Sequence, residues 1–111
     1  MRVLLDHNVN PRYARPLPDH EVSHAHRMGW QELVNGDLIA TAENAGFDEI
    51  ITADKNLQYQ QNLSGRKISI VVLNSIRITL PHIEPLAAQV NVALAGLPPG
   101  AFVTISPKTE E

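Results

Sequence analysis

The sequence predicts a three-layer α/β protein with a mostly parallel central sheet of about five strands. Short runs of β-branched and other apolar residues alternate along the chain with stretches in which apolar residues have helical spacing. Strands separated by helical stretches of about 10–15 residues form βαβ units, which place parallel strands in one sheet with helices on both faces. The length of 111 residues is that of one domain.

Five apolar runs are expected to form the strands. β-branched residues dominate the last three of these runs, as is typical of buried strands. The strongest run ends at Leu73, and the weakest is the second, which contains two histidines. The five ranges are Arg2–Leu5, His20–His24, Glu49–Thr52, Lys67–Leu73 and Ala101–Ile105.

Four stretches between these runs are expected to be helical. Leu38, Ile39 and Ala42 have helical spacing, and Gly46 follows them as a C-terminal stop. Three prolines limit the first stretch to one or two turns, because proline lacks the amide hydrogen that a helix interior uses. The four ranges are Pro11–Leu17, Asp37–Ala45, Asn56–Leu63 and His82–Leu94.

The composition excludes several classes of protein. Apolar residues make up 43% of the chain and charged residues 19%, which favours a compact core over disorder. We expect a single domain over residues 1–106 and a frayed tail at 107–111. The net charge of −3 excludes binding to nucleic acid by bulk charge alone, so any such contact must be local. The absence of cysteine excludes disulfides, thiolate zinc sites and cysteine nucleophiles.

The sequence shows neither a targeting segment nor a membrane segment. The apolar run after Arg2 stops at Asp6, and no run approaches the roughly 18 residues that a transmembrane helix needs. We therefore expect a cytoplasmic protein.

Three carboxylates are expected to meet at one edge of the sheet. Asp6 follows the first strand, Asp54 follows the third, and Asp37 opens the helix that leads into the third. Ligands of such sheets bind beyond the carboxyl ends of the strands. Oxygen ligands of this kind suit Mg²⁺ or Mn²⁺, which can orient a phosphodiester and lower the pKa of an attacking water.

Each of these residues also has a purely structural explanation. Asp6 can begin an Asx-turn, and Asp37 can serve as a helix N-cap or a first-turn acid. Asp54 is harder to explain in this way, because a buried strand ends there abruptly in polar side chains. His24 and His26 are spaced to share one face of a strand and could bind a metal, although a partly exposed strand edge explains them equally well.

Basic residues gather in two parts of the chain. No acidic residue lies between Asp54 and Glu84, and several cations do. Such a rim could hold the phosphates of a nucleic acid beside an acidic site, or it could simply be a solvated face. The cations concerned are Lys55, Arg66, Lys67 and Arg77, together with Arg12 and Arg15 after the first strand.

Four segments of the chain carry a resemblance to a known family. They resemble the PIN-like family of small bacterial proteins of unknown function, which are similar to the toxins of toxin–antitoxin pairs. The resemblance extends from residue 1 to about residue 73, and beyond it only the pattern of helix and strand agrees. The four segments are Val3–Asn8, Met28–Trp30, Asn35–Ala42 and Gly46–Leu57.

The resemblance implies a Rossmann-like PIN fold and an Mg²⁺- or Mn²⁺-dependent ribonuclease. Asp6, Asp37 and Asp54 would then be the catalytic and metal-binding carboxylates. Asn56 stands where many PIN domains have a fourth acid, and Asp37 stands where they often have glutamate. Asn8 and Asn56 would support the metal ligands through hydrogen bonds, and Arg12, Lys55 and Arg66 would hold RNA phosphates.

The partners that the resemblance implies are an RNA substrate, an antitoxin protein and a second copy of the chain. One alternative is a PIN-like module with an incomplete site that binds RNA or protein without cutting it. A phosphoacceptor of the receiver type, suggested by Asp6 followed by Pro11, fails because receivers carry that aspartate after their third strand.

Overall fold

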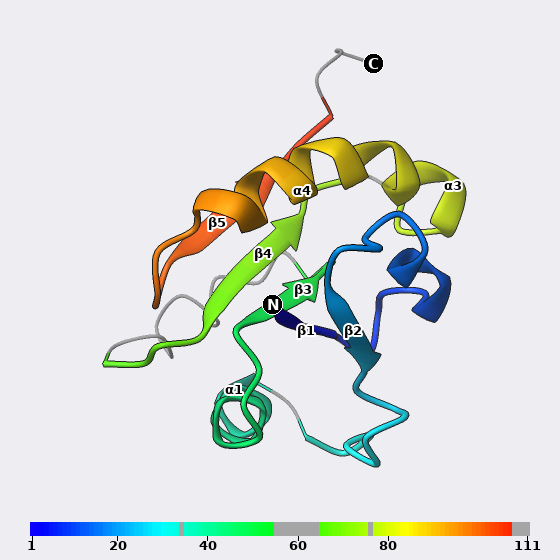
Figure 1. The fold of residues 1–111 in the computed structure, drawn as a ribbon. Helices are drawn as coiled ribbons and strands as arrows, with labels where there is room; N and C mark the ends of the chain where they lie inside the picture. The colour runs from blue at the N-terminus through cyan, green and yellow to red at the C-terminus, as the bar shows by residue number, and fades with distance from the viewer. Residues whose placement is uncertain (34, 55–64, 76, 108–111) are drawn as a thin grey trace.

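The five strands that the structure describes lie in one parallel sheet, in the order β2-β1-β3-β4-β5 (Figure 1). This computed structural model describes residues 1–33, 35–54, 65–75 and 77–107. The predicted α/β class and the parallel five-stranded sheet are confirmed. The strands are β1 (Arg2–Leu5), β2 (Glu21–His24), β3 (Glu49–Thr52), β4 (Ser69–Leu73) and β5 (Phe102–Ile105).

The strands β3 and β4 form the centre of the sheet, and every residue of both is buried. Both faces of these strands are covered, which is why their sequences read as continuous apolar runs rather than as alternating patterns. In the register of the sheet, Ile51 of β3 pairs with Leu5 of β1 and with Val71 of β4.

Helices cover both faces of the sheet, which gives the three predicted layers (Figure 1). Successive residues of a strand point to opposite faces, so Leu5 and Ile51 pack in one core cluster while Leu4 and Ile50 pack in the other. None of the described helices is long and apolar enough to cross a membrane. The helices are α1 (Asn35–Asn44), α3 (Leu80–Ile83), α4 (Ala87–Gly96) and two 3₁₀-helices, η1 (Pro11–Ala14) and η2 (Glu84–Leu86).

The prediction of one continuous helix over His82–Leu94 is wrong, because a 3₁₀ turn interrupts it. Pro85 lies within that turn and cannot donate a backbone hydrogen bond, so α3 ends before it and α4 begins after it. The predicted brevity of the Pro11 helix is confirmed by η1. The helix expected over Asn56–Leu63 lies outside the described residues.

Gly46 ends α1 as the sequence predicts. Its φ of 93° lies in the left-handed region, which residues with a Cβ atom adopt only at an energetic cost. A Cβ atom there would lie 2.8 Å from Nη1 of Arg2, whose guanidinium stacks over the ring of Phe47 with its carbon 4.3 Å from the ring centroid. Gly46 therefore serves both the turn and the close approach of Arg2.

Replacing Tyr13 with phenylalanine is expected to stabilise the protein. The Tyr13 side chain is fully buried, and its hydroxyl has no hydrogen-bond partner within the part of the chain that the structure describes. A buried hydroxyl without a partner costs about 1–3 kcal/mol of desolvation, so Tyr13→Phe should raise the free energy of unfolding by about 1 kcal/mol. Urea denaturation measures the change, and a clear loss of stability in Tyr13→Phe would show that the hydroxyl does have a partner.

Candidate functional site

The candidate site lies where the order of the strands reverses. From β1 the chain goes to β2 on one side, and later returns to β3 on the other side. The crevice beyond the carboxyl ends of two such strands is the usual ligand position in an open parallel sheet. Asp6 directly follows β1, and Asp54 lies two residues after β3, so the structure brings both to this edge.

Asp6 is buried and held by both of its carboxylate oxygens. Oδ2 accepts a hydrogen bond of 2.7 Å from the hydroxyl of Thr52, and Oδ1 accepts one of 2.7 Å from the backbone amide of His7. The backbone amide of Asp6 donates to the carbonyl of Ile51 at 2.9 Å, which extends the β1–β3 pairing to this residue. These contacts fix the position of the carboxylate at the sheet edge.

Thr52 and Asn8 connect Asp6 to the segment that carries Asp54. The Thr52 hydroxyl, which donates to Asp6, also accepts a hydrogen bond of 3.0 Å from the backbone amide of Asp54. The side-chain oxygen of Asn8 accepts a hydrogen bond of 3.0 Å from the backbone amide of Ala53. Asn8 thus holds the chain beside Asp54. The contact made by Thr52 has no signal in the sequence pattern, because Thr52 is simply the last residue of a buried strand.

Asp37 lies in the first turn of α1, and its side chain is exposed. Over the residues that the structure describes, no group of three or more histidine, aspartate or glutamate side chains is arranged to hold a metal ion. The structure therefore places two of the three predicted carboxylates at the β1–β3 edge and does not group Asp37 with them.

Two carboxylates are compatible with a hard divalent cation. Mg²⁺ prefers oxygen ligands and is commonly held by one or two carboxylates, with the remaining positions taken by water and substrate phosphates. Asp6 and Asp54 would hold such an ion, and their all-oxygen donor set fits Mg²⁺ or Mn²⁺.

The histidines form a cluster, but not the metal pair considered from the sequence. β2 ends at His24, so His24 and His26 do not share a strand face. His24 Nε2 donates to the carbonyl of Val9 at 2.7 Å, and its Nδ1 accepts from the backbone amide of His26 at 3.1 Å. Because Nδ1 accepts a hydrogen bond, it carries no proton, and the ring is neutral in this arrangement. Burial also lowers the pKa of His24, which favours the same form.

His7 joins this cluster, which sequence spacing did not reveal. The ring centroid of His26 lies 5.1 Å from that of His7 and 5.0 Å from that of His24. His7 Nε2 donates to the carbonyl of Leu33 at 2.8 Å, which anchors the ring. The cluster arises because β1 and β2 are neighbours whose carboxyl ends carry these residues.

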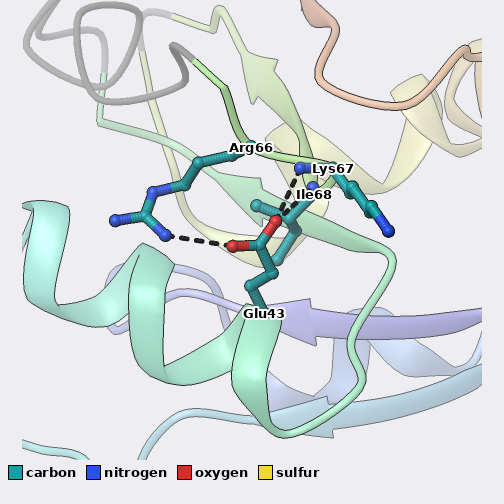
Figure 2. Close-up of polar contacts among 4 residues, drawn as sticks. All are labelled: Glu43, Arg66, Lys67 and Ile68. Carbon is teal, nitrogen blue, oxygen red and sulfur yellow. Dashed lines mark hydrogen bonds and ion pairs between the residues drawn. The ribbon is translucent and has the colours of Figure 1, made fainter.

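Arg66 lies at the other edge of the sheet, before the start of β4, away from Asp6 and Asp54. Figure 2 shows its guanidinium bound to the carboxylate of Glu43 on α1, with Nη1 3.0 Å from Oε1. The second carboxylate oxygen of Glu43 accepts from the backbone amides of Lys67 at 2.6 Å and Ile68 at 3.3 Å. Arg66 thus lies at the amino ends of the strands, and its contact with RNA phosphate stays a prediction.

The remaining predicted contacts with RNA are only partly described. Arg12 is exposed in η1, close in sequence to Asp6. Lys55 and Asn56 lie outside the described residues.

Truncating Glu43 is expected to destabilise the protein. The Lys67 amide donates to this carboxylate in a charge-assisted hydrogen bond, and that bond is the main cause that holds the pKa of Glu43 below its ordinary value. Glu43→Ala should lower the free energy of unfolding by about 1–3 kcal/mol, because backbone donors before β4 lose their acceptor. Denaturation of Glu43→Ala beside Glu32→Ala, an exposed turn residue, measures this effect. Equal stability of the two variants would contradict it.

The fold and the site together define an α/β protein with a five-stranded parallel sheet and two carboxylates beyond its β1 and β3 strands. In comparisons with known proteins, no family model, no curated protein and no solved structure matches the chain.

Proposed function

We propose that this chain is a PIN-like ribonuclease that uses Mg²⁺ or Mn²⁺ to hydrolyse phosphodiesters. One observation carries the proposal: Asp6 and Asp54 follow the two neighbouring strands between which the sheet reverses its order. Carboxylates at that position can hold a hard cation where a ligand normally binds. The resemblance of the first 73 or so residues to the PIN-like family supports the choice of RNA as substrate.

In this proposal each residue has a defined task. Asp6 and Asp54 hold the cation, and Thr52 keeps Asp6 in place through its hydrogen bond. Asn8 orients the chain before Asp54. The bound ion would supply a water of lowered pKa and a charge that orients the phosphodiester. Arg12, exposed on η1, would neutralise a phosphate of the RNA strand.

The same resemblance extends the proposal to cellular context. A toxin of a bacterial toxin–antitoxin pair would be cytoplasmic and would bind an antitoxin protein, and a pair of chains would join two RNA-binding edges. These parts of the proposal rest on the resemblance alone.

A second candidate is a PIN-like module that binds RNA or protein without cutting it. Asp37 is exposed on α1, and no group of three metal-binding side chains is found among the described residues. Without the charge of Asp37, two carboxylates attract a divalent cation less strongly than the three predicted from the sequence.

A cleavage assay separates the two candidates. The full chain is incubated with an end-labelled single-stranded RNA in Mn²⁺, and in parallel in EDTA. The ribonuclease predicts fragments in Mn²⁺ and none in EDTA. Retention of intact RNA on the protein under both conditions would favour the binding module. The absence of both cleavage and RNA binding would overturn the ribonuclease and the RNA-binding form of the module.

A further inference from the structure

A pocket of about 480 Å³ opens beside the proposed metal site, between the segments that follow β1 and β2 and the segment before α3. The η1 and α3 helices lie at this end of the sheet in Figure 1. No side chain that lines the pocket is acidic. The lining residues are His7, Asn8, Val9, Asn10, Pro11, His24, His26, Arg27, Ile78, Thr79 and Leu80.

One part of the pocket wall is cationic and another is apolar. Arg27 is exposed, and within the described ranges its guanidinium has no hydrogen-bond or ion-pair partner. On the apolar part, Ile78 leaves 41% of its surface exposed, which is unusual for a large hydrophobic residue of this protein. An unpaired guanidinium beside exposed apolar surface suits a ligand that has a phosphate and a flat, weakly polar ring.

His26 presents a ring that the protein holds in place. Its backbone amide donates to Nδ1 of His24, and its ring contacts both His7 and His24. Those two neighbours are themselves fixed by hydrogen bonds to the carbonyls of Leu33 and Val9. An exposed aromatic ring with an ordered support is a stacking platform that costs little entropy when a base binds.

The pocket is lined by residues that adjoin the edge with the carboxylates, and neither Asp6 nor Asp54 belongs to its lining. His7, which lines the pocket, directly follows Asp6. Asn8 also lines the pocket, and its side-chain oxygen accepts a hydrogen bond from the backbone amide of Ala53, the residue before Asp54. A strand whose phosphate lay at Asp6 and Asp54 would thus place a neighbouring nucleotide in the pocket.

We propose that this pocket binds one unpaired nucleotide of an RNA strand. The base would stack on His26 against the apolar side formed by Ile78, and Arg27 would pair with a phosphate. The inference rests on the proposed function for its substrate class and places a specific nucleotide subsite next to the cleavage position.

The test is a binding experiment without divalent metal, so that it does not depend on catalysis. Histidine side-chain resonances are followed by NMR in EDTA while a five-nucleotide single-stranded RNA is added. Parallel titrations use a nucleoside 5′-monophosphate and inorganic phosphate. We expect the resonances of His26 and His7 to shift with the oligonucleotide, more weakly with the mononucleotide, and not with phosphate at the same concentration.

Four variants assign the contacts. Arg27→Gln should raise the Kd for the oligonucleotide about tenfold, whereas Arg15→Gln, an exposed arginine outside the pocket lining, should change it less than twofold. His26→Ala should weaken binding about tenfold or more, and His26→Phe should retain it, because stacking needs only a flat ring.

Several results would overturn the proposal. Equal shifts with inorganic phosphate would reduce the pocket to an anion site, and shifts with the mononucleotide alone would identify a free nucleotide rather than a strand as the ligand. Equal losses in Arg27→Gln and Arg15→Gln would show only diffuse charge attraction. Mn²⁺-dependent cleavage without any shift of His26 would refute the pocket and leave the proposed ribonuclease intact, while pocket binding without cleavage would do the reverse.

Discussion

Asp54→Asn is expected to abolish Mn²⁺-dependent RNA cleavage while leaving the protein folded. The substitution keeps the shape of the side chain and removes the charge that would hold the cation. Mutating a residue that only hydrogen-bonds to a metal ligand typically lowers metal affinity or activity about 10–100-fold. For a metal ligand itself we therefore expect cleavage to fall by about a hundredfold or more. Asp54 is only half-buried, and its backbone contact with Thr52 does not depend on the side chain.

The matched control is Asp19→Asn, which removes the same charge from an exposed turn. Cleavage rates at saturating Mn²⁺ and isothermal titration of Mn²⁺ are measured for both variants. Asp37→Asn tests whether Asp37 belongs to the site. A loss of cleavage as large as that in Asp54→Asn would support the three-carboxylate site predicted from the sequence. Wild-type cleavage in Asp54→Asn would contradict the proposed function.

The second large effect concerns Glu49, a buried carboxyl at the start of β3. The residue is 2% exposed, and its Oε1 has no hydrogen-bond partner among the described residues. Burial, with the neighbouring charge of Asp48 as a second cause, raises the pKa of Glu49 to about 7. A protonated, uncharged Glu49 therefore suits the folded protein best.

This pKa makes stability depend on pH in a defined direction. As pH rises above the ordinary value of 4.5, Glu49 loses its proton in the unfolded chain but keeps it in the folded protein until about pH 7. The folded protein then binds more protons than the unfolded chain, so the contribution of Glu49 to stability falls over this interval and levels off above it. The whole change amounts to about 3 kcal/mol at most.

Glu49→Gln should remove this dependence, because glutamine has the shape of protonated glutamate and does not ionise. We expect the variant to be more stable than the wild type by about 1–3 kcal/mol at pH 8 and nearly equal to it at pH 4.5. Urea denaturation at several pH values measures the difference between the two proteins. The difference is the useful quantity, because the lowered pKa of His24 contributes a slope of opposite sign in both proteins.

Glu21→Gln is the control for this series. Glu21 lies on β2 with a side chain that is 73% exposed and 3.9 Å from Arg2, and an exposed ion pair of this kind contributes little to stability. Its removal should change the free energy of unfolding by less than about 0.5 kcal/mol at every pH. If Glu49→Gln behaves in the same way, Glu49 is ionised in the folded protein and the buried acid has a partner.

The sequence determined the secondary structure well because the local signals were strong. Continuous apolar runs placed β3 and β4, and the glycine after α1 placed its end. Within the described residues, the sequence pattern missed the break at Pro85, because the apolar residues on both sides of this proline have helical spacing.

The candidate site was determined only in part, because residues far apart in sequence meet according to strand order. Sequence alone determined that Asp6 and Asp54 follow strands, since polar residues end apolar runs there. The tertiary structure decided that these strands are neighbours, that Thr52 joins the two segments, and that His7 meets His24 and His26. It also placed Arg66 at the opposite edge, because the residue precedes β4 and pairs with Glu43. Local patterns report which side chains a segment buries, whereas only the packing of the sheet reports which segments share an edge.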